Sequence, residues 1–202
     1  MTTPRDLLIA AMDQPTRRPV ERGDLSLALA GGELIDLLSA QAIRLDGDQI
    51  VPSHPPAMPD RLLDEAAASL VREAPYDSLD DYLWRRGRGL ATAYLDALEA
   101  DGQLTRQRLT HWTPSRSSPT VLVDSPARRE AADRWTSDEP VLAALAAAVG
   151  IRDKPTGDSP GVDDDAVATV LAAVDDALRD LEFQRQRRAL DEAAFDNIWR
   201  GG

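Results

Sequence analysis

Apolar residues recur every three to four positions along most of the chain, and this spacing predicts amphipathic helices. The first helix begins with Thr3 as its N-cap and Pro4 at its first helical position, and its apolar stripe continues to Met12. The same spacing predicts helices over residues 24–42, 60–71, 78–100, 125–135 and 140–149, and a long last helix that starts at residues 163–165 and ends in a short tail at residues 193–199. Because residues 140–149 are almost wholly apolar, we expect them to form the most buried helix, at the centre of the core.

Two adjacent glycines, Gly31 and Gly32, lie inside the predicted helix 24–42. A glycine in a helix interior costs about 1 kcal/mol relative to alanine. One interpretation of the pair is the close approach of another backbone or of a ligand, and the other is a break in the helix. The pattern leaves both interpretations open.

Alternation between apolar and polar residues predicts two β-hairpins. The first covers residues 43–51, with Asp46 and Gly47 at its turn because this pair tolerates positive φ angles. The second covers residues 108–124, where a turn rich in proline and serine joins strands at 108–113 and 120–124.

Composition is consistent with a small helical domain and removes several kinds of chemistry. The chain has 202 residues, of which 43% are hydrophobic and only 4% aromatic, so aliphatic side chains supply most of the core. We expect a mainly α fold, with five to eight helices and one or two short β-hairpins in a single domain over residues 1–202. The absence of cysteine excludes disulfides, thiolate catalysis and cysteine-bound zinc.

No residues assemble into a recognisable active site. The sequence lacks a Gly-x-Ser-x-Gly nucleophile elbow and a phosphate-binding glycine loop, and the two histidines, His54 and His111, have no evident catalytic partners. The aspartates at 163–165 lack the glycine and glutamate of a calcium loop and fit a helix N-terminus. We therefore expect no catalytic residue, no metal site and no cofactor, in a protein that binds rather than catalyses.

Charge is distributed unevenly along the chain. The net charge of −12 disfavours binding to nucleic acid, yet nine basic and six acidic residues lie in residues 82–134, which gives that segment +3 and the remainder −15. Arg85, Arg86 and Arg88 cluster near the start of one predicted helix. They fit an anionic ligand or an acidic membrane surface, and the alternative is a solvated arginine face that pairs with the acidic remainder.

The sequence contains no sign of a membrane span or of a secretion signal. No apolar run approaches the roughly 20 residues of a transmembrane helix, and the first residues form an amphipathic segment rather than the apolar centre of a signal peptide. We expect a cytoplasmic protein. Lys154 is the only lysine among 23 basic residues, and this bias is typical of GC-rich bacterial genomes.

Five segments, taken in order, carry a recognisable pattern across nearly the whole chain. They are Asp6–Ala11, Leu27–Leu37, Ile43–Asp46, Leu62–Glu65 and Leu98–Leu104. Together they resemble the Golgi phosphoprotein 3 family, including its bacterial members. The predicted second hairpin and the helix after it also lie where the family has them.

The resemblance implies a mostly helical domain and a non-catalytic adaptor that binds phosphatidylinositol 4-phosphate through a basic pocket. In the family, this pocket uses a tryptophan, an arginine just before the glycine pair, and two arginines three residues apart. The matching positions here are Glu21, Ala30, Arg88 and Ala91, so only Arg88 keeps the family's residue. We expect Arg88, assisted by Arg85, to make the main contacts with any anionic phospholipid headgroup, and we expect that binding to be weak.

The resemblance also implicates the hairpin in self-association and membrane contact. Val121, Leu122 and Val123 are consecutive apolar residues, and Trp112 on the other predicted strand is an aromatic anchor of the kind enriched at interface centres. The first functional hypothesis is a peripheral-membrane adaptor on the inner membrane face, with a reduced headgroup pocket. The alternative is a protein-interaction module that binds no lipid and uses the hairpin 108–124 for self-association or partner docking.

Overall fold

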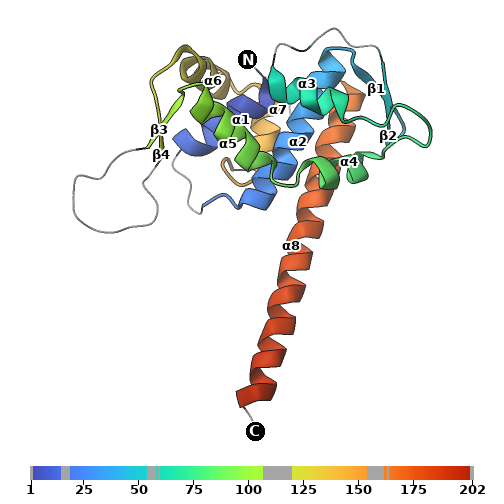
Figure 1. The fold of residues 1–202 in the computed structure, drawn as a ribbon, viewed down its shortest axis with the longest axis vertical. Helices are drawn as coiled ribbons and strands as arrows, with labels where there is room; N and C mark the ends of the chain where they lie inside the picture. The colour runs from blue at the N-terminus through green and yellow to red at the C-terminus, as the bar shows by residue number, and fades with distance from the viewer. Residues whose placement is uncertain are drawn as a thin grey trace.

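Eight helices and two short antiparallel hairpins make up the part of the chain that the structure describes (Figure 1). The structure is a computed structural model and describes residues 2–14, 19–53, 58, 60–106, 120–153, 162 and 164–200. The helices are α1 (Thr3–Asp13), α2 (Arg22–Ser39), α3 (Arg61–Ala68), α4 (Leu79–Arg86), α5 (Leu90–Ala100), α6 (Pro126–Thr136), α7 (Pro140–Ala148) and α8 (Asp165–Arg200). The strands are β1 (Ile43–Asp46), β2 (Gln49–Pro52), β3 (Leu104–Arg106) and β4 (Thr120–Leu122). The predicted mainly α fold is confirmed.

Helix α2 forms the centre of the molecule. It packs against α1, α8, α5 and α4, and every residue from Leu25 to Ile35 is buried. The expectation that residues 140–149 would be the most buried helix is wrong. Although α7 is almost wholly apolar, its alanines leave one side half-exposed, and only Leu142, Leu145, Ala146 and Ala147 are buried. A helix surrounded by others therefore buries more than a helix that is merely apolar.

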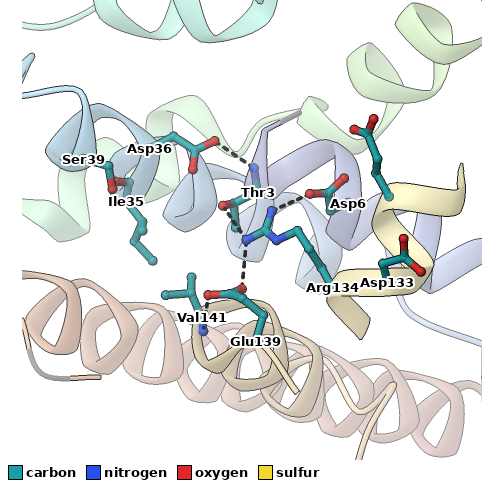
Figure 2. A pocket seen from close by; sticks show the side chains of 10 residues that line it. Thr3, Asp6, Ile35, Asp36, Ser39, Asp133, Arg134, Glu139 and Val141 are labelled. Carbon is teal, nitrogen blue, oxygen red and sulfur yellow. Dashed lines mark hydrogen bonds and ion pairs between the residues drawn. The ribbon is translucent and has the colours of Figure 1, made fainter. Parts of the chain in front are cut away.

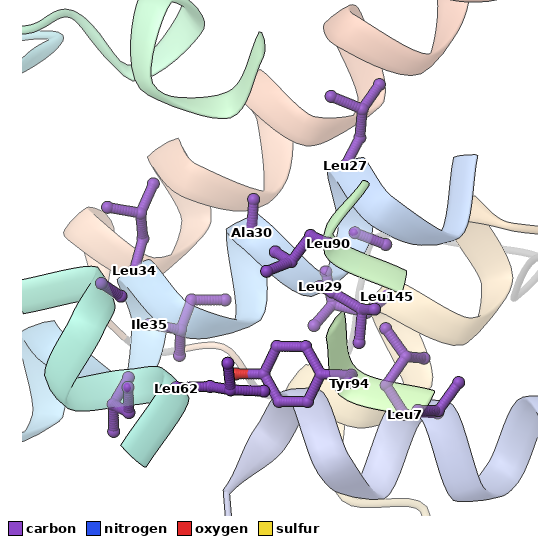
Figure 3. Close-up of a cluster of buried hydrophobic side chains, with 14 of the residues drawn as sticks. Leu7, Leu27, Leu29, Ala30, Leu34, Ile35, Leu62, Leu90, Tyr94 and Leu145 are labelled. Carbon is purple, nitrogen blue, oxygen red and sulfur yellow. The ribbon is translucent and has the colours of Figure 1, made fainter. Parts of the chain in front are cut away.

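The core is built mainly from aliphatic side chains, to which all eight helices contribute, and Figure 3 shows part of it. Leu7 of α1, Leu29 of α2, Leu62 of α3 and Leu145 of α7 surround the ring of Tyr94 from α5. Each fully buried leucine contributes roughly 1.5–3 kcal/mol relative to an exposed one. The few aromatic residues thus add to a core whose stability comes mainly from leucine.

The glycine pair in α2 permits close packing of two different helices, α8 at Gly31 and α1 at Gly32. A Cβ atom added at Gly31 would overlap the Val174 side chain of α8, whereas one added at Gly32 would lie 3.4 Å from Pro4. The helix continues unbroken through both residues, so the interpretation as a helix break is wrong. A neighbouring helix does approach Gly31 closely, but through the side chain of Val174 rather than through its backbone or a ligand, as the other interpretation had it.

Several predicted helix boundaries need correction. The first helix is capped one residue earlier than predicted, at Thr2, and the predicted helix 24–42 spans Arg22–Ser39 instead. The predicted helix 78–100 is two helices: α4 ends at Arg86 with Gly87 as its C-cap, and Gly89, with a left-handed φ of 72°, is the N-cap of α5. Ser78 caps α4 as predicted, with its Oγ accepting a hydrogen bond from the Asp81 amide at 3.1 Å.

The first hairpin is confirmed, and the second is only partly described. Strands β1 and β2 pair with Leu45 opposite Ile50, and Gly47 at the turn has a φ of 62°. In the second hairpin, the strand before the turn begins at Leu104, ahead of the predicted 108–113, which lies outside the described residues. The left-handed Gly102 turns the chain immediately after α5, so pairing starts sooner than the apolar pattern indicates.

Helix α8 is one continuous helix of 36 residues that runs through the segment predicted to be a separate tail. Asp164 caps it, with Oδ1 accepting from the Ala166 amide at 2.8 Å, while Asp163 lies outside the described residues. Its first half packs on α2 and α4, and its second half runs clear of the body (Figure 1). No helix in the described ranges is long and apolar enough to cross a membrane.

Candidate functional site

A buried ion pair joins α2 to α4 near the predicted basic cluster. The side chain of Glu33 is 0% exposed and accepts hydrogen bonds from Nε and Nη2 of Arg86, at 2.8 and 2.9 Å. Tyr94 donates a third hydrogen bond to Glu33 at 3.0 Å, and Arg86 also donates to the carbonyl oxygen of Leu62 at 2.9 Å. Because both carboxylate oxygens have charged or hydroxyl donors, a charge can be kept in this core.

Burial and ion pairing shift the pKa values of Glu33 and Arg86 in opposite directions. Burial raises the pKa of Glu33, and the hydrogen bonds and charge of Arg86 oppose that shift. Burial alone would lower the pKa of Arg86, but the contacts with Glu33 raise it above its ordinary value. Arg86 is therefore a fixed structural cation, and it is not available to bind a phosphate.

The other two arginines of the cluster differ in how they are held. Arg85 is 43% exposed, donates a hydrogen bond to Asp77 at 2.5 Å and lies over the ring of Tyr82, 5.5 Å from its centroid. Arg88 is exposed in the turn between α4 and α5 and makes no ion pair with any residue that the structure describes. Of the three arginines, only Arg88 has its full charge available to solvent.

The positions that match the family's headgroup pocket do not form a basic pocket. Ala30 and Ala91 are fully buried where α2 meets α5. At this contact Ser26 accepts a hydrogen bond from the Ala91 amide at 3.0 Å. Glu21 is exposed at the N-terminus of α2. The contact is thus filled by small side chains, and no guanidinium group lies there to bind a headgroup.

A pocket of about 570 Å³ opens between α1, α2, α6 and α7 (Figure 2). Arg134 points into it and donates hydrogen bonds to Asp6 and, at 2.8 Å, to Glu139. On the other side Asp36 accepts from the Thr3 amide at 2.8 Å. The lining residues are Thr3, Asp6, Ile35, Asp36, Ser39, Glu130, Asp133, Arg134, Glu139 and Val141.

This pocket carries five carboxyl groups and one guanidinium group. Burial raises the pKa of Asp6, while the hydrogen bond and charge of Arg134 oppose the shift. Burial also raises the pKa of Asp36. Oδ1 of Asp6 is buried and has no hydrogen-bond partner among the described residues. Such a lining attracts cations and repels phosphate, so the pocket is unsuited to a lipid headgroup.

The sequence gives little warning of this acidic pocket. Its charged residues lie on or next to four helices, and the first and last of them, Asp6 and Glu139, are 133 positions apart in the sequence. They form no local motif. Asp6 next to a predicted N-terminus is an ordinary first-turn acid. Only the packing of α1 against α6 and α7 brings Asp6 to Arg134.

The residues predicted for the hairpin interface fall into different environments. Val121 is exposed and Val123 is half-buried, while Leu122 is buried in the core opposite Leu104. The prediction is therefore corrected for Leu122, which is not available to a partner. Trp112 lies outside the described residues, as do both histidines. Within the described part of the chain, no group of acidic residues is arranged to hold a metal ion.

Comparison with known proteins gives one result that covers nearly the whole fold. A model of the Golgi phosphoprotein 3 (GPP34) family matches residues 4–193, from the start of α1 well into α8. No curated protein matches the chain. The matched residues include the central helix α2, both hairpins and the basic turn at Arg88. The chain therefore belongs to the Golgi phosphoprotein 3 family.

Proposed function

We propose that this chain is a non-catalytic adaptor that recognises other proteins and does not hold a phosphoinositide headgroup in the family's pocket. The observation that carries the proposal is the burial of Ala30 and Ala91 at the contact between α2 and α5. The resemblance assigns phosphate-binding arginines to these two positions. Here each position is occupied by a methyl group inside the core.

The loss of these contacts is large on the scale of binding energies. A hydrogen bond to a charged group contributes roughly 1.5–3 kcal/mol, so each missing arginine weakens headgroup binding by about one to two orders of magnitude. Arg86 cannot compensate, because its guanidinium group is bound to Glu33. Arg85 is partly neutralised by Asp77.

Long-range electrostatics act in the same direction. The chain carries a net charge of −12, and the pocket around Arg134 is dominated by carboxyl groups. An anionic bilayer repels such a surface overall, and the exposed Arg88 attracts the bilayer only locally. Any attraction through Arg88 is screened over about 8 Å at physiological ionic strength, so contact with a membrane through this residue is weak and sensitive to salt.

The second hairpin is the contact surface that we assign to a protein partner. Val121 is exposed on β4, and the neighbouring segment that contains Trp112 supplies a large aromatic side chain by sequence. Exposed apolar residues with an aromatic anchor are typical of the centres of protein interfaces. We expect Trp112→Ala to weaken partner binding without changing the melting temperature.

Liposome co-sedimentation tests the proposal directly. We expect the wild-type protein to sediment equally with neutral vesicles and with vesicles that contain phosphatidylinositol 4-phosphate, at physiological salt. Arg88→Ala and the control Arg179→Ala, which removes an exposed arginine of α8, should behave alike. Binding that requires phosphatidylinositol 4-phosphate and is lost only in Arg88→Ala would instead support the lipid-binding function.

A further inference from the structure

The second half of α8 has no cover within the described chain. The last contacts with the body are those of Leu181 and Arg185 with the start of α2, where Arg185 pairs with Asp24 at 2.7 Å. From Gln186 to Glu192 every side chain is exposed, and the helix continues to Arg200. We call residues 186–200 the stalk; at about 1.5 Å per residue it extends roughly 22 Å from the body.

The stalk and its base expose two large apolar side chains. Phe183 is 65% exposed and Leu190 is 71% exposed, whereas Val71 and Val121, the other large apolar side chains that are exposed among those described, are 37% and 38% exposed. An isolated helix of about 15 residues is only marginally stable in water. A helix of this length with bulky apolar groups in solvent gains stability if another surface covers it.

The apolar positions share one face, and unpaired charges lie along its edge. Phe183 and Leu190 are seven residues apart and therefore lie on the same side of the helix. At about 100° per residue, Arg187 and Asp191 lie about 40° and 80° from Phe183, on the same edge of that face. Neither forms an ion pair with a residue that the structure describes.

We propose that a second copy of this chain covers the stalk, with the two helices antiparallel and a two-fold axis beside residue 189. In this arrangement the edge that carries Arg187 and Asp191 on one helix faces the same edge of the partner helix. Arg187 then lies opposite Asp191 of the partner subunit, and Asp191 lies opposite the partner's Arg187. Leu190 packs beside the partner's Leu190 at the centre. The surface is thus complementary to itself, as a two-fold interface requires.

A parallel pair fits the charges less well. Two parallel helices would bring Arg187 towards Glu182 of the partner subunit, following the usual spacing of parallel coiled coils. Glu182 already accepts a hydrogen bond from Gln186 at 2.9 Å and lies 3.8 Å from Arg185. The parallel arrangement would also leave Asp191 unpaired. The antiparallel arrangement pairs Arg187 and Asp191, neither of which has an ion-pair partner within the described chain.

A hollow at the base of the stalk provides space for the end of the partner helix. It has a volume of about 400 Å³ and is lined by Asp24, Ala148, Leu178, Phe183 and other residues of α8. With the axis beside residue 189, the last residues of the partner helix lie level with Leu178. The antiparallel register therefore places the partner's helix end beside Phe183, which it would cover.

Sedimentation equilibrium with matched variants tests the interface. We expect the wild-type chain to form a dimer as concentration rises and Leu190→Glu to remain a monomer. Ala189→Glu adds the same charge about 100° around the helix from Leu190, on the side away from Arg187 and Asp191, and should still dimerise. Because Leu190 lies outside the body, unchanged thermal unfolding will show that Leu190→Glu is folded. A wild-type chain that stays monomeric at millimolar concentration, or a Leu190→Glu dimer, would overturn the proposal.

Charge reversal tests the register. Arg187→Asp places two aspartates opposite each other at both pairs and should weaken dimerisation roughly tenfold. Adding Asp191→Arg in the same chain exchanges both charges and should restore wild-type dimerisation. A double variant that is no tighter than Arg187→Asp would contradict the assigned pairing.

Cross-linking tests the direction of the helices. The chain has no cysteine, so Arg187→Cys and Asp191→Cys each introduce a single thiol. We expect a short bismaleimide to join the two variants to each other more efficiently than it joins either variant to itself. Preferential cross-linking of each variant to itself would indicate parallel helices and would overturn the proposal.

Discussion

Helices α2 and α8 are the two longest helices of the chain, and they have opposite surroundings. In α2, residues 25–35 are all buried, and even the charged Glu33 has its hydrogen-bond partners inside the body. In α8, the first half packs on α2, but every side chain from Gln186 to Glu192 is exposed. The comparison shows that α2 is covered by helices of the same chain, whereas the stalk has an apolar face that the described part of the chain does not cover.

The largest expected effect comes from breaking the buried ion pair of the body. Glu33→Ala leaves Arg86 in the core without its carboxylate, and removal of one partner of a buried pair costs about 3–5 kcal/mol. We expect this loss in the free energy of unfolding measured with urea. The control Glu65→Ala removes the exposed partner of Arg61 and should cost only about 0.5 kcal/mol. Equal losses of unfolding free energy in the two variants would show that the burial of Glu33 does not make its ion pair more important for stability.

The next effect distinguishes the two adjacent glycines of α2, of which Gly31 faces α8 and Gly32 faces Pro4 of α1. Gly31→Ala places a methyl group against Val174 and should destabilise the protein by about 1–3 kcal/mol. Gly32→Ala meets Pro4 at 3.4 Å and gains helix propensity, so it should change stability by less than about 1 kcal/mol. Thermal unfolding measures both. Val174→Ala should recover part of the loss in Gly31→Ala, and a lack of recovery would contradict the assigned contact.

A smaller effect concerns pH and the acidic pocket. Burial raises the pKa of Asp36 above its ordinary value of 3.8, so the folded state holds this proton more tightly than the unfolded state. The contribution of Asp36 to the stability of the folded state is therefore fully present below pH 3.8, and it is lost as the pH rises through the pKa of Asp36 in the folded state. Asp36→Asn keeps an acceptor for the Thr3 amide and removes the charge.

We therefore expect Asp36→Asn to raise the melting temperature relative to the wild type at pH 7 and to lose this advantage near pH 3. Asp48→Asn, which changes an exposed carboxyl group in the first hairpin, serves as the control and should have little effect at either pH. A gain at pH 3 that equals the gain at pH 7 would show that the charge of Asp36 is not the cause.

The smallest effect is expected when the stalk is altered in the monomer. Leu190 contacts nothing in the body, so Leu190→Glu should change the free energy of unfolding of the body by at most about 0.5 kcal/mol. Chemical denaturation at low protein concentration, where the wild type is also monomeric, provides the comparison. A loss as large as that of Gly31→Ala would mean that the stalk contributes to the body.

Local signals in the sequence were sufficient for much of the fold. Ser78 and Asp60 cap helices as their sequence context predicts, and Asp46 and Gly47 form the predicted turn. Apolar spacing does not predict the break between α4 and α5, because it continues across the turn at residues 87–89, where Gly87 caps α4 and Gly89 has a left-handed φ. Such features depend on how the chain packs, which periodicity does not encode.

The candidate site was less predictable, because its residues meet only in the folded chain. The sequence placed three arginines together, but it did not indicate that Arg86 pairs with Glu33, which is 53 residues away. It likewise left open whether Ala30 and Ala91 border a pocket, and their burial is a property of the contact between α2 and α5. Arg88 is a candidate site residue by its position in the sequence; the structure shows that it is exposed, and its role in binding stays a prediction.

Hydrogen exchange along α8 tests most directly the claim that one chain completes the body and a second copy completes the stalk. We predict that amides of residues 165–181 are equally protected at all concentrations, in the wild type and in Leu190→Glu. Amides of residues 186–200 should be protected only in the wild type, and only at concentrations where it is dimeric. Protection of residues 186–200 in the Leu190→Glu monomer, or rapid exchange in a wild-type dimer, would contradict this account.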